Sequence, residues 1–333
     1  MSTISREALN KWVDALGEER TLIAPKDVSG VLLYEPVKNS SEVVYNYVRP
    51  VMSIKDAFFP ATERLLAIEK DGNSINISEF RPENEQILFG VRPCDARGLL
   101  ALDALFIETE PVDSYYARRR KGTTIIGLAC TEMADTCFCT STGGAPDDTT
   151  GMDIMVYPVD DGYHVRALTE KGEKIKNAEW EMQGAEKFEQ YTKREPQFEI
   201  PNLDSWPAQF ENNFWAEMAE RCLSCRICAY VCPTCRCFDV RDESVHSDNG
   251  TNKFERIRCW DSCVGTVYRR IAGGHNPREA KGERLRNRFM CKFYYYPEQY
   301  GPTACTGCGR CIDSCPVNID ITEVISHLAE ATK

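Results

Sequence analysis

The sequence has little of several features on which common protein functions depend. It contains only four histidines in 333 residues, which leaves little material for histidine acid–base or metal chemistry. No G-x-G-x-x-G run follows a predicted strand and no G-x-x-x-x-G-K-[ST] run occurs, so we expect no nucleotide or flavin site on this chain. Positive charge is also in deficit. The 40 Lys and Arg face 51 Asp and Glu, a net charge of −11 that argues against nucleic-acid binding.

Long apolar runs are lacking as well. The apolar stretch 124–130 is only as long as a strand, whereas a membrane-spanning helix needs about 18–20 apolar residues. The first ten residues show no basic segment leading into an apolar run, so they do not resemble a secretory signal. We therefore expect a cytoplasmic protein that is not itself inserted in a membrane.

Cysteine, in contrast, is abundant, with 17 residues, or about one in twenty. This density is too low for a short secreted disulfide scaffold, and a chain of this length can bury a core without disulfide bonds. The cytoplasm keeps thiols reduced. Cysteines at short, regular spacings in such a chain are therefore interpreted as metal ligands.

The pattern of apolar and polar residues changes along the chain. Short apolar runs broken by Gly, Pro and Asp predict strands at 30–34, 64–69, 86–91 and 123–128, and a helix at 95–105 separates the last two. We predict an α+β fold. Its parts are a mixed α/β domain (1–175), a charged helical connection (176–207) and a mainly helical, ferredoxin-like domain with two clusters (208–333), which carries an insertion at about 238–304.

One cysteine motif occurs twice. Residues 222–233 and 305–316 both match C-x2-C-x2-C-x3-C-P in full. In the bacterial two-cluster arrangement, the first three cysteines of each run bind one cubane and the fourth binds the other. A structural zinc site is the alternative, but such sites are usually built from two separated pairs, and these dense runs fit them poorly. The crossed rule predicts two 4Fe–4S clusters, bound by Cys222, Cys225, Cys228 and Cys315, and by Cys305, Cys308, Cys311 and Cys232.

Four further cysteines lie in the amino-terminal half. Cys94 follows one predicted strand, and Cys130, Cys137 and Cys139 follow another. Because loops at the ends of neighbouring strands can converge, and because a cubane needs four thiolates, we predict a third 4Fe–4S site at these residues. The alternative is a set of buried free thiols, since cysteine is often buried.

Five cysteines remain without a clear role. Cys235, Cys237, Cys259 and Cys263 could form an extra iron–sulfur or zinc site, but packing or thiol hydrogen bonds fit them equally well. Cys291 has no assignment. Nearby, the segment 256–292 is rich in Lys and Arg, which could offset the charge of clusters, present a docking face to an acidic partner, or simply form a solvated helix face.

Six short motifs, in order along the chain, are similar to those of one protein family. They are residues 89–96, 127–132, 135–141, 232–239, 260–263 and 274–278. Together they resemble the iron–sulfur beta subunit of cytoplasmic sulfhydrogenase-type nickel–iron hydrogenases. They equally resemble the iron–sulfur subunit of anaerobic sulfite reductase and the dicluster subunits of flavin oxidoreductases linked to heterodisulfide reductase.

The resemblance covers the chain from about residue 20 and implies an electron-transfer subunit of a multisubunit oxidoreductase. It implies a partner that binds flavin and NAD(P), together with a terminal catalytic subunit of hydrogenase, sulfite reductase or heterodisulfide reductase type. The chain would then not convert the substrate itself. Two alternatives stay open: a metal-stabilised scaffold, and a reductase with its own substrate-reactive cluster. The family does not regularly place cysteines at the positions of Cys259 and Cys291.

Overall fold

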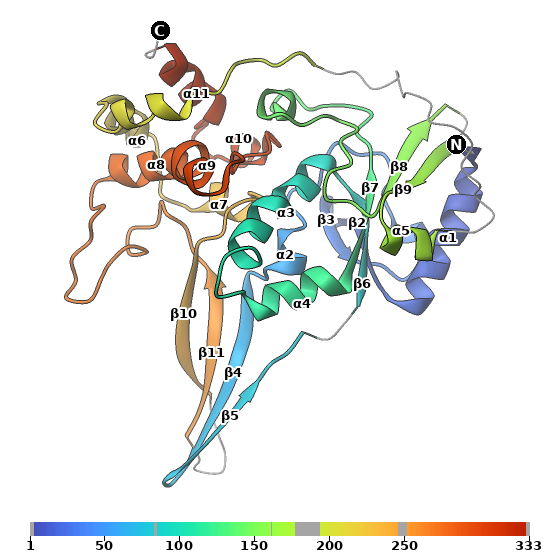
Figure 1. Cartoon of the computed structure of the whole chain (residues 1–333), viewed down its shortest axis with the longest axis horizontal. Coiled ribbons are helices and arrows are strands. Elements are labelled where there is room, and N and C mark those ends of the chain that lie inside the picture. Colours follow the sequence, from blue (N-terminus) through green and yellow to red (C-terminus); the bar gives the residue numbers. More distant parts are fainter. Residues whose placement is uncertain (1–2, 83–84, 161, 177–193, 246–251, 331–333) are drawn as a thin grey trace.

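A computed structural model describes the chain except for residues 1–2, 83–84, 161, 177–193, 246–251 and 331–333. The described part combines two β-sheets with a group of helices, which confirms the predicted α+β class (Figure 1). Part of the predicted charged connection, at 177–193, lies outside the described residues. Within the described residues, no helix combines the length and apolar character needed to cross a membrane.

The larger sheet has seven strands in the order β1-β9-β8-β7-β6-β2-β3. β2, β6, β7 and β8 run parallel, and the outer pairs are antiparallel. The bounds are β1 Thr3–Ile4, β2 Thr21–Val28, β3 Val31–Pro36, β6 Gln86–Val91, β7 Thr123–Leu128, β8 Ile154–Val159 and β9 Gly162–Ala167.

Apolar layers cover both faces of this sheet, and the sequences of β6 and β7 show why. Every residue of β7 is buried, as is all of β6 except Gln86, because a central parallel strand faces apolar packing on both sides. The helix α1 (Arg6–Glu19) packs into one layer and α3 (Pro93–Phe106) into the other. The carboxyl ends of β6 and β7 therefore open at the same edge.

Three further helical segments accompany this half of the chain, together with two short 3-10 turns. The helices are α2 (Lys55–Phe58), α4 (Ser114–Gly122) and α5 (Glu170–Ile175), and the turns are η1 (Ser40–Glu42) and η2 (Cys139–Thr142).

The smaller sheet is a long antiparallel ribbon that projects from the body (Figure 1). Its strands are β4 (Thr62–Asp71), β5 (Ser74–Glu79), β10 (Phe238–Val245) and β11 (Asn252–Trp260), in the order β10-β11-β4-β5. β11 lies in the predicted insertion and pairs with β4 of the amino-terminal half. This pairing ties the insertion to the amino-terminal half, a connection that the sequence does not reveal.

Most of the remaining helices border a third apolar core, to which Cys263 and Cys305 belong, whereas Tyr296, which begins another of them, packs with Ala101 and Ala104 of α3. Stacked rings, such as Trp206 on Phe293, fill this core. The helices are α6 (Phe214–Glu220), α7 (Ile227–Tyr230), α8 (Lys281–Met290), α9 (Tyr296–Tyr300), α10 (Arg310–Asp313) and α11 (Ile321–Glu330). The short turns are η3 (Leu203–Ser205), η4 (Pro207–Gln209) and η5 (Cys291–Tyr295), the last a π-helical turn.

Candidate metal centres

The two cysteine runs adopt the same backbone conformation. Ser224 and Gly307 occupy equivalent positions and have φ of 53° and 65°, and the next equivalent pair, Arg226 and Gly309, has φ of 69° and 76°. A non-glycine residue with positive φ costs about 1–2 kcal/mol and persists where its surroundings demand it. The left-handed turns recur in each run, and a short helix within the run, α7 or α10, follows the second of them and carries the third cysteine.

The first predicted ligand set lies around one cavity. Its wall includes all four predicted thiols and is otherwise mostly apolar, with Val264, Phe289 and Ile321 among its residues. Cys315 reaches this cavity from the second run, as the crossed arrangement requires. The four lining thiols are Cys222, Cys225, Cys228 and Cys315. Cys225 and Leu223 are exposed, so this centre lies near the protein surface.

The second predicted set is deeper. Cys232, Cys305 and Cys308 are buried, and Cys311 is half-buried. Burial raises the pKa of Cys305 to about 11, and negative charge on Cys232 and Cys308 adds to the rise. Lys292 Nζ donates to Cys232 Sγ at 3.2 Å, which places a buried cation on a predicted ligand. The four thiols come from two distant runs, but they lie close enough for their charges to interact. They are Cys232, Cys305, Cys308 and Cys311.

The third predicted set gathers at the open edge of the large sheet. Cys94 lies in the first turn of α3, and Cys130 follows β7. Burial raises the pKa of Cys139 to about 12, and negative charge on Cys130 and Cys137 raises it further. Burial also raises the pKa of Cys94, and negative charge on Cys130 contributes to this rise. The structure thus brings these four thiols together from separate loops.

The third and second sets touch through their backbones. The Phe138 amide donates to the Gly307 carbonyl at 2.8 Å. A Cβ at Gly307 would lie 2.5 Å from the backbone of Phe138 and Cys139, so only glycine fits here. The two cysteine-bearing loops are therefore in direct contact.

A buried ion pair joins the same two sets. Arg310, between Cys308 and Cys311, donates two hydrogen bonds to the Asp95 carboxylate, at 2.6 and 2.7 Å, and both side chains are fully buried. Arg49 forms a second link, because it donates to Cys137 Sγ at 2.9 Å and pairs with Asp313 on α10. The sequence pattern does not single out Arg49, Asp95 or Arg310.

Of the four cysteines considered for a possible extra site, the structure brings three together. Cys235, Cys237 and Cys263 line a common cavity, but Cys259 lies on β11 and accepts a hydrogen bond from the Thr62 hydroxyl at 3.6 Å. Cys291, to which the sequence assigns no role, lines the cavity instead. Within the described residues, no three His, Cys, Asp or Glu side chains lie close enough together to hold a single metal ion.

Comparisons with known proteins agree with this interpretation of the cysteines. The 4Fe-4S dicluster domain family matches residues 221–319, the part of the chain that contains both cysteine runs. The chain is 32% identical to sulfhydrogenase 2 subunit beta of Pyrococcus furiosus over 97% of both proteins. No solved structure matches it.

These findings confirm the resemblance drawn from the six motifs and the prediction of two 4Fe–4S clusters. The fit is also physical. The backbone turns, the crossed cysteine and the cation on Cys232 suit cubanes held by four thiolates. The protein is an iron–sulfur subunit that takes part in electron transport within a multisubunit oxidoreductase. The chain therefore belongs to the family of iron–sulfur beta subunits that includes the sulfhydrogenase beta subunit.

Proposed function

We propose that this chain relays electrons, in the cytoplasm, between two other subunits. One binds flavin and NAD(P), and the other is a terminal catalytic subunit of hydrogenase, sulfite reductase or heterodisulfide reductase type. The observation that carries the proposal is the direct contact between the loops of neighbouring cysteine sets, above all Gly307 on Phe138 and Cys139. A scaffold that used metal only for stability would not need its metal sites to touch.

The three cysteine sets are spatial neighbours, one after another, starting at the surface. The set with the exposed Cys225 lies at the surface, and its wall includes Cys311 of the buried set. The buried set in turn contacts the loop of Cys137 and Cys139. When bound, iron–sulfur clusters accept and release single electrons, at potentials set by burial, charge and hydrogen bonds to sulfur. We propose that the third set also holds a 4Fe–4S cluster, which extends the relay into the amino-terminal half.

The surrounding residues prepare each set for this role. Apolar side chains such as Phe289 and Ile321 form much of the wall around the first set and so limit its contact with water. Lys292 donates to Cys232, and Arg49 donates to Cys137. Cations placed at thiolates favour the more negative, reduced state, and so raise the reduction potential of the group that these thiolates hold.

The relay is tested on the complex isolated with its natural partners. NAD(P)H is mixed rapidly with the complex, and the iron–sulfur absorbance is followed alongside conversion of the terminal substrate. Bleaching of this absorbance before the substrate reacts, at a rate no slower than turnover, is expected. Turnover that is unchanged when the first set is removed by Cys222→Ser and Cys225→Ser would sink the relay.

The third set is tested by iron and sulfide analysis of the Cys137→Ser, Cys139→Ser double variant. The expected loss is one cubane, about four irons per chain. Cys259→Ser is the matched control, because this thiol lies on the ribbon and lines none of the cysteine cavities described above. Iron content equal to that of the control would rule out the third cluster.

A further inference from the structure

Four cysteines outside the three sets line one cavity of about 210 Å³. Cys235 and Cys237 follow the first cysteine run, Cys263 follows β11, and Cys291 begins the π-helical turn after α8. Turns of this kind are rare and frequently occur at functional sites. Three separate segments therefore converge on this cavity, and each brings at least one thiol.

The cavity wall is positively charged. Arg236 Nη2 donates to Cys291 Sγ at 3.6 Å, and Arg288 Nη1 points to Cys235 Sγ at 3.8 Å. Lys292 and Arg269 complete the group of lining cations. Among the residues that the structure describes, none of these four has a carboxylate within ion-pair distance. The cavity is thus lined by thiols and cations, without a carboxylate to balance the charge.

Two of these cations are buried, which makes the imbalance costly. Arg288 and Lys292 are each only 4% exposed. Arg288 Nη2 is buried and has no hydrogen-bond partner in the described structure. Both residues also serve the ferredoxin-type sets, since Arg288 borders the first cavity and Lys292 binds Cys232. A buried cation requires compensating negative charge, which the ferredoxin-type sets supply in part and to which thiolates of this cavity would add.

The size of the cavity selects the kind of group. A zinc ion would draw four thiolates to about 2.3 Å from one point and leave no such space between them. A single water needs only about 10–15 Å³, far less than this cavity. Four thiolates around an open space are the ligand set of an iron–sulfur cluster. We propose that Cys235, Cys237, Cys263 and Cys291 hold a further iron–sulfur cluster, whose negative charge Arg236 and Arg288 balance.

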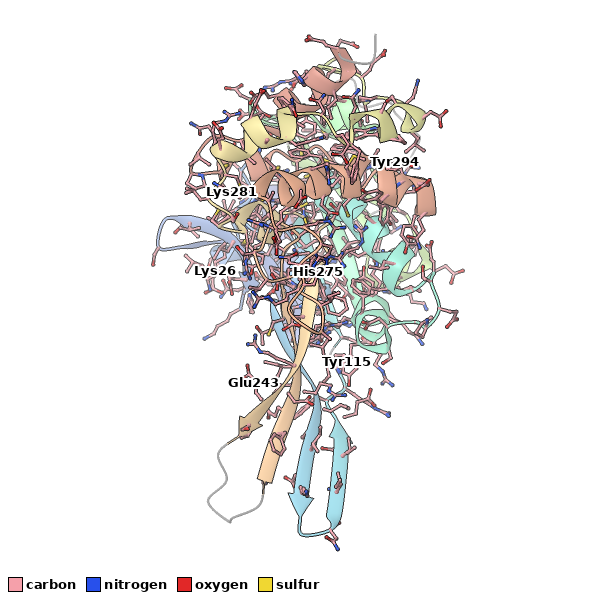
Figure 2. The ribbon with its side chains drawn as sticks, turned by 90° about the vertical axis from the view of Figure 1, so that its left-hand side faces the viewer. Lys26, Tyr115, Glu243, His275, Lys281 and Tyr294 are labelled. Carbon is pink, nitrogen blue, oxygen red and sulfur yellow. The ribbon has the colours of Figure 1, made fainter. Side chains whose placement is uncertain are left out.

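The site would lie beside the buried ferredoxin-type set. Lys292 lines this cavity and also donates to Cys232 Sγ at 3.2 Å, so one cation would contact ligands of both clusters. Tyr268 and the exposed Arg269 also line the cavity. Figure 2 shows His275, of the same loop, on the face turned toward the viewer, between the ribbon and Lys281. A role for this cluster in electron transfer rests on the proposed function. Whether the cluster is present does not depend on that function.

The test uses the full-length chain, purified without oxygen and supplied with iron and sulfide. The Cys263→Ser, Cys291→Ser variant should lose about four irons and about four sulfides relative to the parent chain, whereas Cys259→Ser should lose none. The EPR signals of the ferredoxin-type clusters should persist in both. Because they persist independently, loss of this site is distinguishable from failure of the relay.

A second variant distinguishes loss of the cluster from misfolding of the first variant. Cys235→Ala with Cys237→Ala removes thiols from a different segment and should produce the same loss of iron and sulfide. Unchanged iron in either soluble variant would overturn the proposal. Zinc in place of iron at this site, or a Cys237–Cys263 disulfide in the cluster-loaded parent chain, would overturn it as well.

Discussion

Single residues decide whether the cysteine loops can approach one another. Gly307 combines a φ of 65° with backbone atoms 2.5 Å from where a Cβ would lie. Gly273 has a φ of 88° but nothing within 4 Å of where a Cβ would lie. Replacing it with alanine therefore adds only backbone strain and no steric clash. We expect Gly307→Ala to lower the free energy of unfolding by about 1–3 kcal/mol more than Gly273→Ala, since only the former overpacks.

The measurement is a denaturant titration of both variants, with iron analysis of each. Gly307→Ala should also lose iron, because the backbone must move at the junction of two cysteine sets. Equal midpoints and equal iron content for the two variants would show that the contact at Gly307 is unimportant.

The Arg310–Asp95 pair makes a second prediction at this scale. Replacing Arg310 with methionine leaves the Asp95 carboxylate buried without its partner, which should cost about 3–5 kcal/mol. The control is Arg256→Met on the ribbon, where Arg256 forms a similar two-bonded pair with Asp242, but both side chains are exposed. That change should leave the free energy of unfolding almost unchanged, because exposed ion pairs contribute little to stability. Similar thermal shifts for the two variants would show that burial of the Arg310–Asp95 pair does not matter.

The residue scale also shows what the sequence can predict. The eight ferredoxin-type cysteines, including the crossed Cys315, follow from local spacing, because a tight loop has few ways to wrap a cubane. Arg310 and Asp95 are 215 residues apart, so no local pattern connects them. Lys292 lies within the basic segment, but its hydrogen bond to Cys232 depends on tertiary packing.

At the scale of elements, the large sheet follows from sequence more readily than the ribbon does. The apolar runs at 86–91 and 123–128 predict β6 and β7, and parallel strands explain why Cys94 and Cys130 meet at one edge. β10 is exposed along almost its whole length, so it shows no clear alternation of apolar and polar residues. The sequence of the insertion therefore reveals neither its strands nor the partner to which they pair.

The ribbon makes the two halves interdependent. β11 pairs with β4 over most of its length, and Phe59 packs against Phe238 and Trp260. We expect a fragment of residues 1–207 to expose this apolar surface, to bind a hydrophobic dye and to be cleaved by protease at β4. Comparison with the full-length chain under the same conditions measures this. A fragment that resists protease as well as the whole chain does would show that the halves fold independently.

At the scale of the whole molecule, charge is unevenly distributed. The chain carries a net charge of −11, but four Arg and Lys side chains line the cavity of the four extra cysteines, and two Arg side chains border the first cavity. Buried cations without carboxylates are what anionic clusters require, and two of them, Arg288 on α8 and Lys292 on the π-helical turn, lie beside thiols of the first cysteine run or its continuation. The positive charge of an otherwise acidic chain is thus concentrated near the cysteines that we propose to bind the clusters of the relay.

The most direct test of the relay is a redox titration of the intact chain followed by low-temperature EPR. Because neighbouring cysteine sets are in contact, the reduced chain should show cubane signals that broaden and split as adjacent clusters become reduced together. The iron content should account for at least the two ferredoxin-type clusters. A dithionite-reduced chain that contains zinc in place of iron and gives no cubane signal would contradict the relay.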